Sequence, residues 1–156
     1  MSPGSTLLFG AIPTQLKFPA LEKRQLAGFA RSLSNEVAAG RPFTCLIADD
    51  RELRRLNFAF LANNYPTDVL SFPSPRHIED LGEIAISVER AEAQAHEFGH
   101  GRLDEICLLM LHGVLHLVGL DHETDDGRMA RAERLWRAHF GLPQNLIARS
   151  ETVLTP

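Results

Sequence analysis

The chain has 156 residues, of which 44% are hydrophobic and 23% are charged, and its formal net charge is −4. This length predicts a single domain over residues 1–156 with a substantial core, and the small negative charge argues against unspecific nucleic-acid binding by the whole surface. Two distant cysteines make no disulfide framework, residues 1–14 show no secretory signal and no apolar run is long enough to cross a membrane, so we expect a cytoplasmic protein.

Hydrophobic periodicity divides the chain into alternating strands and helices, followed by helices alone. Strands are predicted at residues 6–12, 43–48, 68–72 and 83–88. Helices are predicted at residues 20–39, from Asp49 or Asp50 to the Asn63-Asn64 pair, and at 89–98, 104–118 and 124–140. This order predicts an α+β fold in which helices cover a small mixed sheet. Residues 104–118 are apolar nearly all round, which predicts a central buried helix.

Three histidines in the segment 112–122 indicate a metal site. His112 and His116 are four residues apart and therefore share one face of a helix. Gly119 is expected to end that helix in a left-handed conformation, so that the following turn can bring His122 back toward the other two. A single histidine in such an apolar stretch is more often a core residue than a metal ligand. Burying three unpaired imidazoles is costly, however, and a bound metal would remove that cost. Three imidazoles leave one position of a tetrahedral metal open, as in catalytic zinc sites, although nickel, copper and iron also accept imidazole.

Two protease-like features of the sequence are weak. His96 and His100 belong to an H-E-x-x-H pattern, but Gly99 and Gly101 predict that the helix ends before His100, which we interpret as a solvated helix end. The segment 112–122 has metzincin spacing, yet Gly113 occupies the position of the glutamate base. A metalloprotease is therefore a less favoured hypothesis.

The stretch from Pro66 to Pro73 has proline at both ends and polar residues between apolar ones, which predicts an edge strand. Such an edge could dock an extended substrate. Thr67, Asp68 and Ser71 are candidate substrate-binding residues, with hydrogen bonding at the turn and strand ends as the alternative interpretation.

The motifs P-T-D-V-L-S-F-P at 66–73 and H-G-x-L-H-L-x-G-x-D-H at 112–122, together with Leu81-Gly82-Glu83-Ile84 and Asn57, resemble the YbeY family of bacterial endoribonucleases. The resemblance implies a compact α+β fold and one zinc ion held by His112, His116 and His122. It also implies cleavage of single-stranded RNA in the 3′-end maturation of small-subunit ribosomal RNA and in ribosome quality control. The expected partners are therefore ribosomal RNA or the small ribosomal subunit.

The chain departs from that family at two positions. Before Asp121 it has Leu120 where the family often has tyrosine, a change that is conservative for packing, and the second departure concerns the cleft. The family usually has an arginine four residues after the asparagine, and this chain has Leu61 there. Leucine neither holds a phosphate nor stabilises developing negative charge, and Arg54, Arg55 and Arg76 are the candidate substitutes. An RNA-binding ribosome assembly factor with weak or no catalysis is therefore the alternative function.

The last helix carries an arginine at every third position, 128, 131, 134 and 137. These side chains form either a solvated face paired with nearby acids such as Glu133 or a contact to RNA phosphate. The apolar face of this helix is expected to run through Met129, Leu135, Trp136 and Phe140.

Overall fold

The computed structural model describes residues 5–64, 67–75, 80–120 and 126–144. In these residues the strands are β1 (Thr6–Phe9), β2 (Thr44–Ala48), β3 (Val69–Pro73) and β4 (Gly82–Ser87). The helices are α1 (Ala20–Ser32), α2 (Asp50–Leu61), α3 (Val88–Phe98), α4 (Arg102–Leu117) and α5 (Arg128–Phe140), with a short 3-10 helix η1 (Thr14–Leu16) and a π-helical turn η2 (Leu33–Val37). Each predicted strand and helix is present. The last helix begins later than predicted, at Arg128 and not at Thr124, because Asp126 and Gly127 form a turn with positive φ, and residues 124–125 lie outside the described ranges.

The four strands of the described chain form one mixed sheet in the order β1-β2-β4-β3. β1 pairs with β2 and β2 with β4 in parallel, whereas β3 pairs with β4 antiparallel. β3 is therefore an edge strand, as the prolines at its two ends predict. Together with the helices, this sheet confirms the mixed α+β fold.

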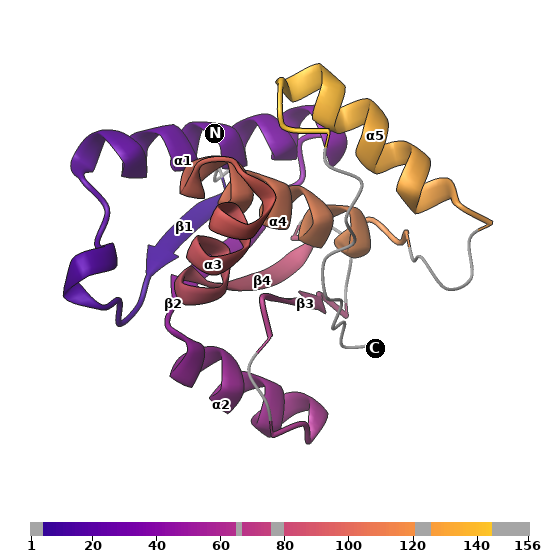
Figure 1. The fold of residues 1–156 in the computed structure, drawn as a ribbon. Coiled ribbons are helices and arrows are strands. Elements are labelled where there is room, and N and C mark those ends of the chain that lie inside the picture. Colours follow the sequence, from indigo (N-terminus) through magenta and orange to yellow (C-terminus); the bar gives the residue numbers. More distant parts are fainter. Residues whose placement is uncertain (1–4, 65–66, 76–79, 121–125, 145–156) are drawn as a thin grey trace.

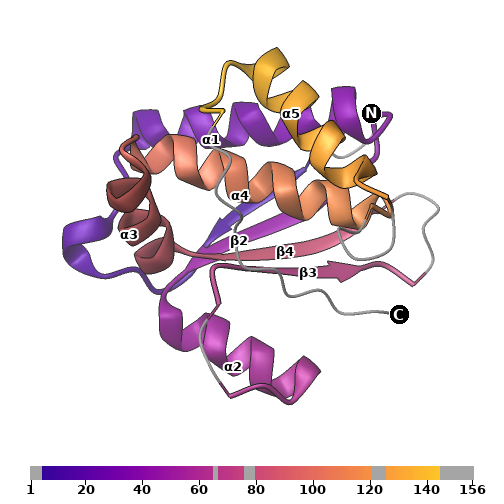
Figure 2. The same cartoon turned by 45° about the vertical axis from the view of Figure 1, so that its right-hand side comes forward.

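Helices cover both faces of the sheet (Figures 1 and 2). In Figure 2, α4 lies between the sheet below it and α1 and α5 above it, while α2 lies on the opposite face. Strand side chains alternate accordingly: Cys45 and Ile47 join the main core with α1 and α4, whereas Ala48 packs with Leu53 of α2. Helix α4 packs against β3, β4, α1, α3 and α5 and is buried at nearly every residue from Glu105 to Leu117, so its central position is confirmed.

Glycine allows α4 to lie unusually close to the sheet. A Cβ at Gly113 would lie 3.0 Å from both Cδ1 and Cγ2 of Ile84 on β4. The carbonyl of Gly113 also accepts a hydrogen bond from the hydroxyl of Ser71 on β3, at 3.4 Å. The helix is thereby held against both strands at the residue directly after His112.

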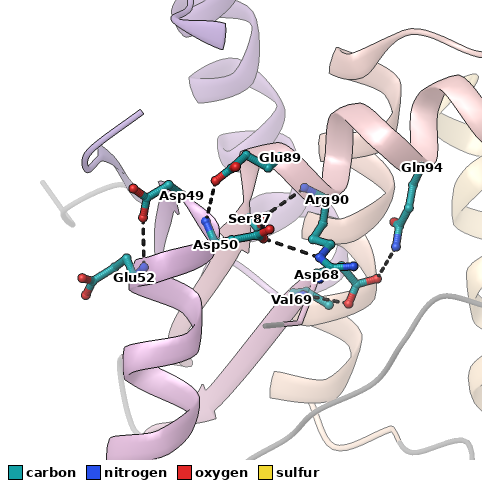
Figure 3. A network of polar contacts seen from close by, with 9 residues as sticks. All are labelled: Asp49, Asp50, Glu52, Asp68, Val69, Ser87, Glu89, Arg90 and Gln94. Carbon is teal, nitrogen blue, oxygen red and sulfur yellow. Dashed lines mark hydrogen bonds and ion pairs between the residues drawn. The ribbon is translucent and has the colours of Figure 1, made fainter. Parts of the chain in front are cut away.

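A polar network joins the first turns of α2 and α3 (Figure 3). The Asp49 carboxylate accepts from the Glu52 N–H at 2.9 Å and caps α2. Asp50 accepts from the Ser87 hydroxyl at 2.5 Å, and its own N–H donates to the Glu89 carboxylate at 2.8 Å. These bonds connect α2 to the junction of β4 and α3 and satisfy donors that a helix start leaves unpaired.

Neither cysteine is in a disulfide: Cys45 is buried and Cys107 is half-buried, both as free thiols. Within the described ranges, none of the helices has the length and apolar character that a membrane crossing requires.

Gly82 opens β4 in a backbone conformation that other residues avoid. Its φ is +133°, and a Cβ there would lie 2.2 Å from the carbonyl oxygen of Phe72 on the neighbouring strand. The glycine at the start of β4 is therefore required by the β3–β4 pairing.

We expect Gly82→Ala to lower the free energy of unfolding by about 2–3 kcal/mol, because a side chain both strains the backbone and strikes the Phe72 carbonyl. Gly99→Ala is the matched control, since Gly99 also has positive φ (+75°) but a Cβ there meets nothing within 4 Å, and its expected cost is about 1 kcal/mol. Urea unfolding followed by circular dichroism measures both. Equal losses in the two variants would contradict the steric argument.

Candidate functional site

His112 and His116 lie one turn apart near the end of α4 and are almost buried, with 4% and 7% of their surfaces exposed. Their ring centroids are 4.7 Å apart and the rings are inclined by 77°. The two Nε2 atoms face each other at 3.2 Å. The spacing of four residues therefore brings both imidazoles to one point, as the sequence predicts.

The other ring nitrogen of each imidazole is held by an oxygen. The Nδ1 of His116 is 3.0 Å from the backbone carbonyl of Leu120, and the Nδ1 of His112 contacts the carboxylate of Glu133. A carbonyl and an ionised carboxylate only accept, so both contacts favour a proton on Nδ1 and leave Nε2 to ligate a metal or to share a proton with the other ring. This is the tautomer in which histidine binds a metal through Nε2.

The distance between the two Nε2 atoms fits one tetrahedral ion. Two nitrogens bound to zinc at about 2.0–2.1 Å in tetrahedral geometry lie about 3.3 Å apart, close to the observed 3.2 Å. The third predicted ligand, His122, lies outside the described residues. Among the residues that the structure describes, no group of three or more His, Cys, Asp or Glu side chains is arranged to hold a metal.

The chain turns directly after the two histidines. Gly119 has a φ of +103°, which confirms that it ends the helix in a conformation suited to glycine. Its N–H donates to the His116 carbonyl at 3.0 Å, and the Leu120 N–H donates to the Leu115 carbonyl at 3.0 Å. The turn thereby places the Leu120 carbonyl against the His116 ring.

Asp68 lies just before β3 and has only 1% of its surface exposed. Its carboxylate accepts from the Gln94 side chain at 3.0 Å and from the Val69 N–H at 2.8 Å (Figure 3). Burial raises the pKa of this carboxyl group, while the two hydrogen bonds and the influence of His112 act in the opposite direction. The sequence did not indicate a role for Gln94, since a polar residue on a helix of mixed composition carries no distinctive signal.

The other two candidate substrate residues are also buried. Thr67 precedes Asp68, and the hydroxyl of Ser71 donates to the Gly113 carbonyl, so that Ser71 connects the edge strand to the histidine helix. The structure thus gathers Asp68, Ser71 and the two histidines around the contact between β3 and α4.

The H-E-x-x-H pattern does not form a site. Its first histidine, His96, is exposed on α3, and Gly99 ends that helix with a φ of +75°. The interpretation of His100 as part of a solvated end is wrong: its side chain is 8% exposed and its Nε2 lies 2.6 Å from the buried Glu105 carboxylate. A buried carboxylate needs such a partner, and the imidazole supplies it.

Leu61, in the position of the family's arginine, is the last residue of α2. It packs against the apolar cluster that α2 forms with the sheet, which includes Leu53 and Leu70. Of the proposed substitutes, Arg54 donates to the Asn64 side chain at 2.9 Å and Arg55 pairs with Glu52 at 2.5 Å, both on the surface. Arg76 lies outside the described residues.

The interpretation of α5 needs two corrections. Leu135 does not belong to the buried face, since 72% of its surface is exposed. Arg137 does not belong to an exposed arginine stripe, because it is buried and donates to Glu133 at 3.3 Å, whereas Arg128, Arg131 and Arg134 are exposed. The sequence did contain a signal for this buried face, the four-residue spacing of Met129, Glu133 and Arg137. Because two of these residues are charged, that spacing resembled a solvated helix face.

An α+β domain with two facing, oriented imidazoles beside an edge strand defines a candidate metal-dependent hydrolase. Comparisons with known proteins agree: the family model described as endoribonuclease YbeY matches residues 17–140. A protein of Solibacter usitatus named endoribonuclease YbeY is 54% identical over 149 residues, 96% of this chain and 97% of that protein. A Sulfurovum protein of the same name is 40% identical over 139 residues, 85% of this chain and 88% of that protein. The chain therefore belongs to the endoribonuclease YbeY family, a family of nucleases and hence of hydrolases.

A solved structure supports the fold. The solution structure of a Thermotoga maritima protein matches 92% of this chain and 99% of its own with a TM-score of 0.57 and 23% sequence identity.

We expect Asp68→Asn to become more stable relative to the parent chain as the pH rises from about 4 to 7. A raised pKa in the folded state means that folding favours the protonated carboxyl, so the parent loses stability as pH rises above the unfolded value of about 3.9 and through the folded one. Asparagine abolishes this titration. If the Gln94 amide group rotates by half a turn, the asparagine NH₂ can donate to Gln94 Oε1, an atom that has no hydrogen-bond partner in the described structure. Urea unfolding of both chains in chelator across this pH range measures the difference. A difference that does not change with pH would contradict the assignment.

Proposed function

We propose that this chain is a zinc-dependent endoribonuclease specific for single-stranded RNA. In this proposal it acts in the cytoplasm on ribosomal RNA or the small ribosomal subunit, in 3′-end maturation of the small-subunit RNA and in ribosome quality control. His112, His116 and His122 hold one Zn²⁺, and Thr67, Asp68 and Ser71 form the substrate side of the site. The family to which the chain belongs supports the reaction class, and the free thiols of Cys45 and Cys107 fit a reducing compartment.

The facing Nε2 atoms of His112 and His116 are the observation that carries the metal assignment. They are 3.2 Å apart, and each Nδ1 is held by an oxygen that only accepts. Two lone pairs at this distance repel each other unless a proton or a cation lies between them. A metal ion relieves that repulsion and uses both rings in the tautomer that their Nδ1 partners favour.

Zinc in a three-histidine site supplies Lewis-acid chemistry toward a phosphodiester and lowers the pKa of water. The chain's own residues bind and orient the substrate around it. Edge strand β3 offers an outer edge that no strand of the described chain pairs with, and an extended RNA strand can lie along it. Asp68, with its raised pKa, holds a proton at its carboxyl group more readily than an exposed aspartate, and Ser71 holds this edge against α4.

Peptide hydrolysis fits this site less well than RNA cleavage. A metzincin protease has its glutamate base at the position of Gly113. A Cβ there would lie 3.0 Å from the Ile84 side chain, which would have to shift to accept it.

An RNA-binding assembly factor with little catalysis is the second candidate, and Leu61 favours it. This leucine contributes to an apolar cluster instead of presenting a cation, and Arg54 and Arg55 are engaged with Asn64 and Glu52. Such a protein would bind RNA through the same surface without stabilising the charge that develops during cleavage.

We expect single-stranded RNA to be cleaved by the purified protein, cleavage to stop with chelator, and His116→Ala to lower the rate by about 100-fold or more, because one ligand is lost. His96→Ala is the matched control, since His96 is an exposed histidine on α3 and its removal should leave the rate unchanged. Gel analysis of labelled RNA and parallel incubation with casein make the comparison.

The remaining outcomes separate the candidates. Tight RNA binding without cleavage would favour the assembly factor, and cleavage of casein would favour a protease. Protein purified without chelator that contains no bound metal would refute the ligand assignment.

A further inference from the structure

Three charged or ionisable side chains form a buried line behind the metal site. Glu133 and Arg137 on α5 are each 8% exposed, and His112 on α4 is 4% exposed. One carboxylate oxygen of Glu133 contacts the Nδ1 of His112, and the other accepts from Arg137 at 3.3 Å. Charged groups are rarely buried unless each has a partner, and here the carboxylate serves the two neighbours at once.

The line is built by the packing of two helices. Met129, Glu133 and Arg137 are spaced four residues apart and form the buried face of α5, which packs against α4. Glu133 is 21 residues from His112, so only this packing brings its carboxylate to the ring. Figure 2 shows α5 lying along the upper side of α4, away from the sheet.

The two candidate ligands are held in different ways. His116 is oriented locally, by the carbonyl of Leu120 in the turn that follows its own helix. His112 is oriented by a side chain from another helix, the carboxylate of Glu133 on α5. The orientation of His112 therefore depends on how α5 packs, whereas that of His116 does not.

We propose that Glu133 is the positioning residue of the metal site, an inference that rests on the proposed function for the identity of the ligands. Its carboxylate keeps the proton of His112 on Nδ1 and fixes the ring plane, so that Nε2 faces the Nε2 of His116. Arg137 holds the second carboxylate oxygen and prevents the Glu133 side chain from turning away. A carboxylate behind a ligating histidine orients the ring and raises its basicity, and losing such a partner typically costs 10–100-fold in metal affinity.

A purely structural role for Glu133 predicts a different result. If Glu133 only neutralised Arg137, its replacement would lower stability without changing the His112 tautomer. If Glu133 positions His112, the tautomer changes even without metal. The decisive readout is therefore the protonation site of His112 in metal-free protein.

The first experiment is ¹⁵N NMR of the histidine rings in the full chain with chelator, at about pH 8.5, where ordinary imidazoles are neutral. We expect His112 to be protonated at Nδ1 in the parent chain and to become a mixture of both tautomers in Glu133→Ala. Glu133→Gln retains an acceptor oxygen and should keep most of the parent tautomer. Arg134→Gln, an exposed neighbour on the same helix, is the control and should change nothing.

A second variant keeps the test decisive if Glu133→Ala fails to fold. The double variant Glu133→Met/Arg137→Met replaces both buried charges by apolar side chains of similar size, an exchange that is often neutral for stability. It should show the same mixture of His112 tautomers. An unchanged Nδ1 proton on His112 in a folded variant that lacks the carboxylate would overturn the proposal.

The second experiment measures Zn²⁺ affinity by competition with a chelating dye. We expect affinity to fall about 10–100-fold in Glu133→Ala or the double variant, to fall less in Glu133→Gln, and to stay unchanged in Arg134→Gln. Parent-like affinity in folded protein without the carboxylate would also overturn the proposal. If the parent itself binds no Zn²⁺, the proposed function fails at its metal, while the tautomer experiment still decides whether Glu133 positions His112.

Discussion

The close contact between α4 and the sheet at Gly113 determines where the site lies. With no side chain at this residue, the helix reaches Ile84 on one strand and its carbonyl reaches the Ser71 hydroxyl on the next. Gly113 follows His112 directly and precedes His116 by three residues, so this contact sets the rotation of the helix and the side on which both imidazoles emerge. The contact joins the histidine helix to the edge strand of the proposed substrate site, and it disfavours the glutamate that a protease would need there, because a Cβ would press on Ile84.

Burial of the histidines imposes a second requirement, because a polar ring in an apolar core needs a partner at each nitrogen. The structure meets it with a backbone carbonyl for His116 and a carboxylate for His112, and it brings the two remaining nitrogens to 3.2 Å from each other. The same pairing principle places Asp68 beside Gln94 and His100 beside Glu105. Several buried polar groups are thus paired with a group from another element, and the pair of His112 and Glu133 lies behind the candidate metal site.

Most of the fold could be predicted from the sequence, because its signals are local. Alternation and turn residues located the strands, the prolines around β3 marked it as an edge, and the apolar residues of α4 marked it as central. The apolar face of α5 was predicted correctly at Met129, Trp136 and Phe140, which pack with the main core, and incorrectly at Leu135. There the buried face carries Glu133 and Arg137, which a periodicity argument assigns to solvent, while Leu135 is exposed because the core does not extend to its side of the helix. Mutual pairing of two charges is what makes their burial possible, and a single-helix pattern does not contain that information.

The sequence by itself determined that His112 and His116 share one helix face, because the period of the α-helix brings residues i and i+4 together, and that Gly119 ends the helix. Its motifs also indicated the family that the comparisons confirm. Only the tertiary structure decided which groups contact the Nδ1 atoms of the imidazoles, how edge strand β3 is attached to α4, and that Leu61 belongs to an apolar cluster. These features depend on packing between elements far apart in the chain, where the partner of a side chain is set by the docking of whole helices and strands.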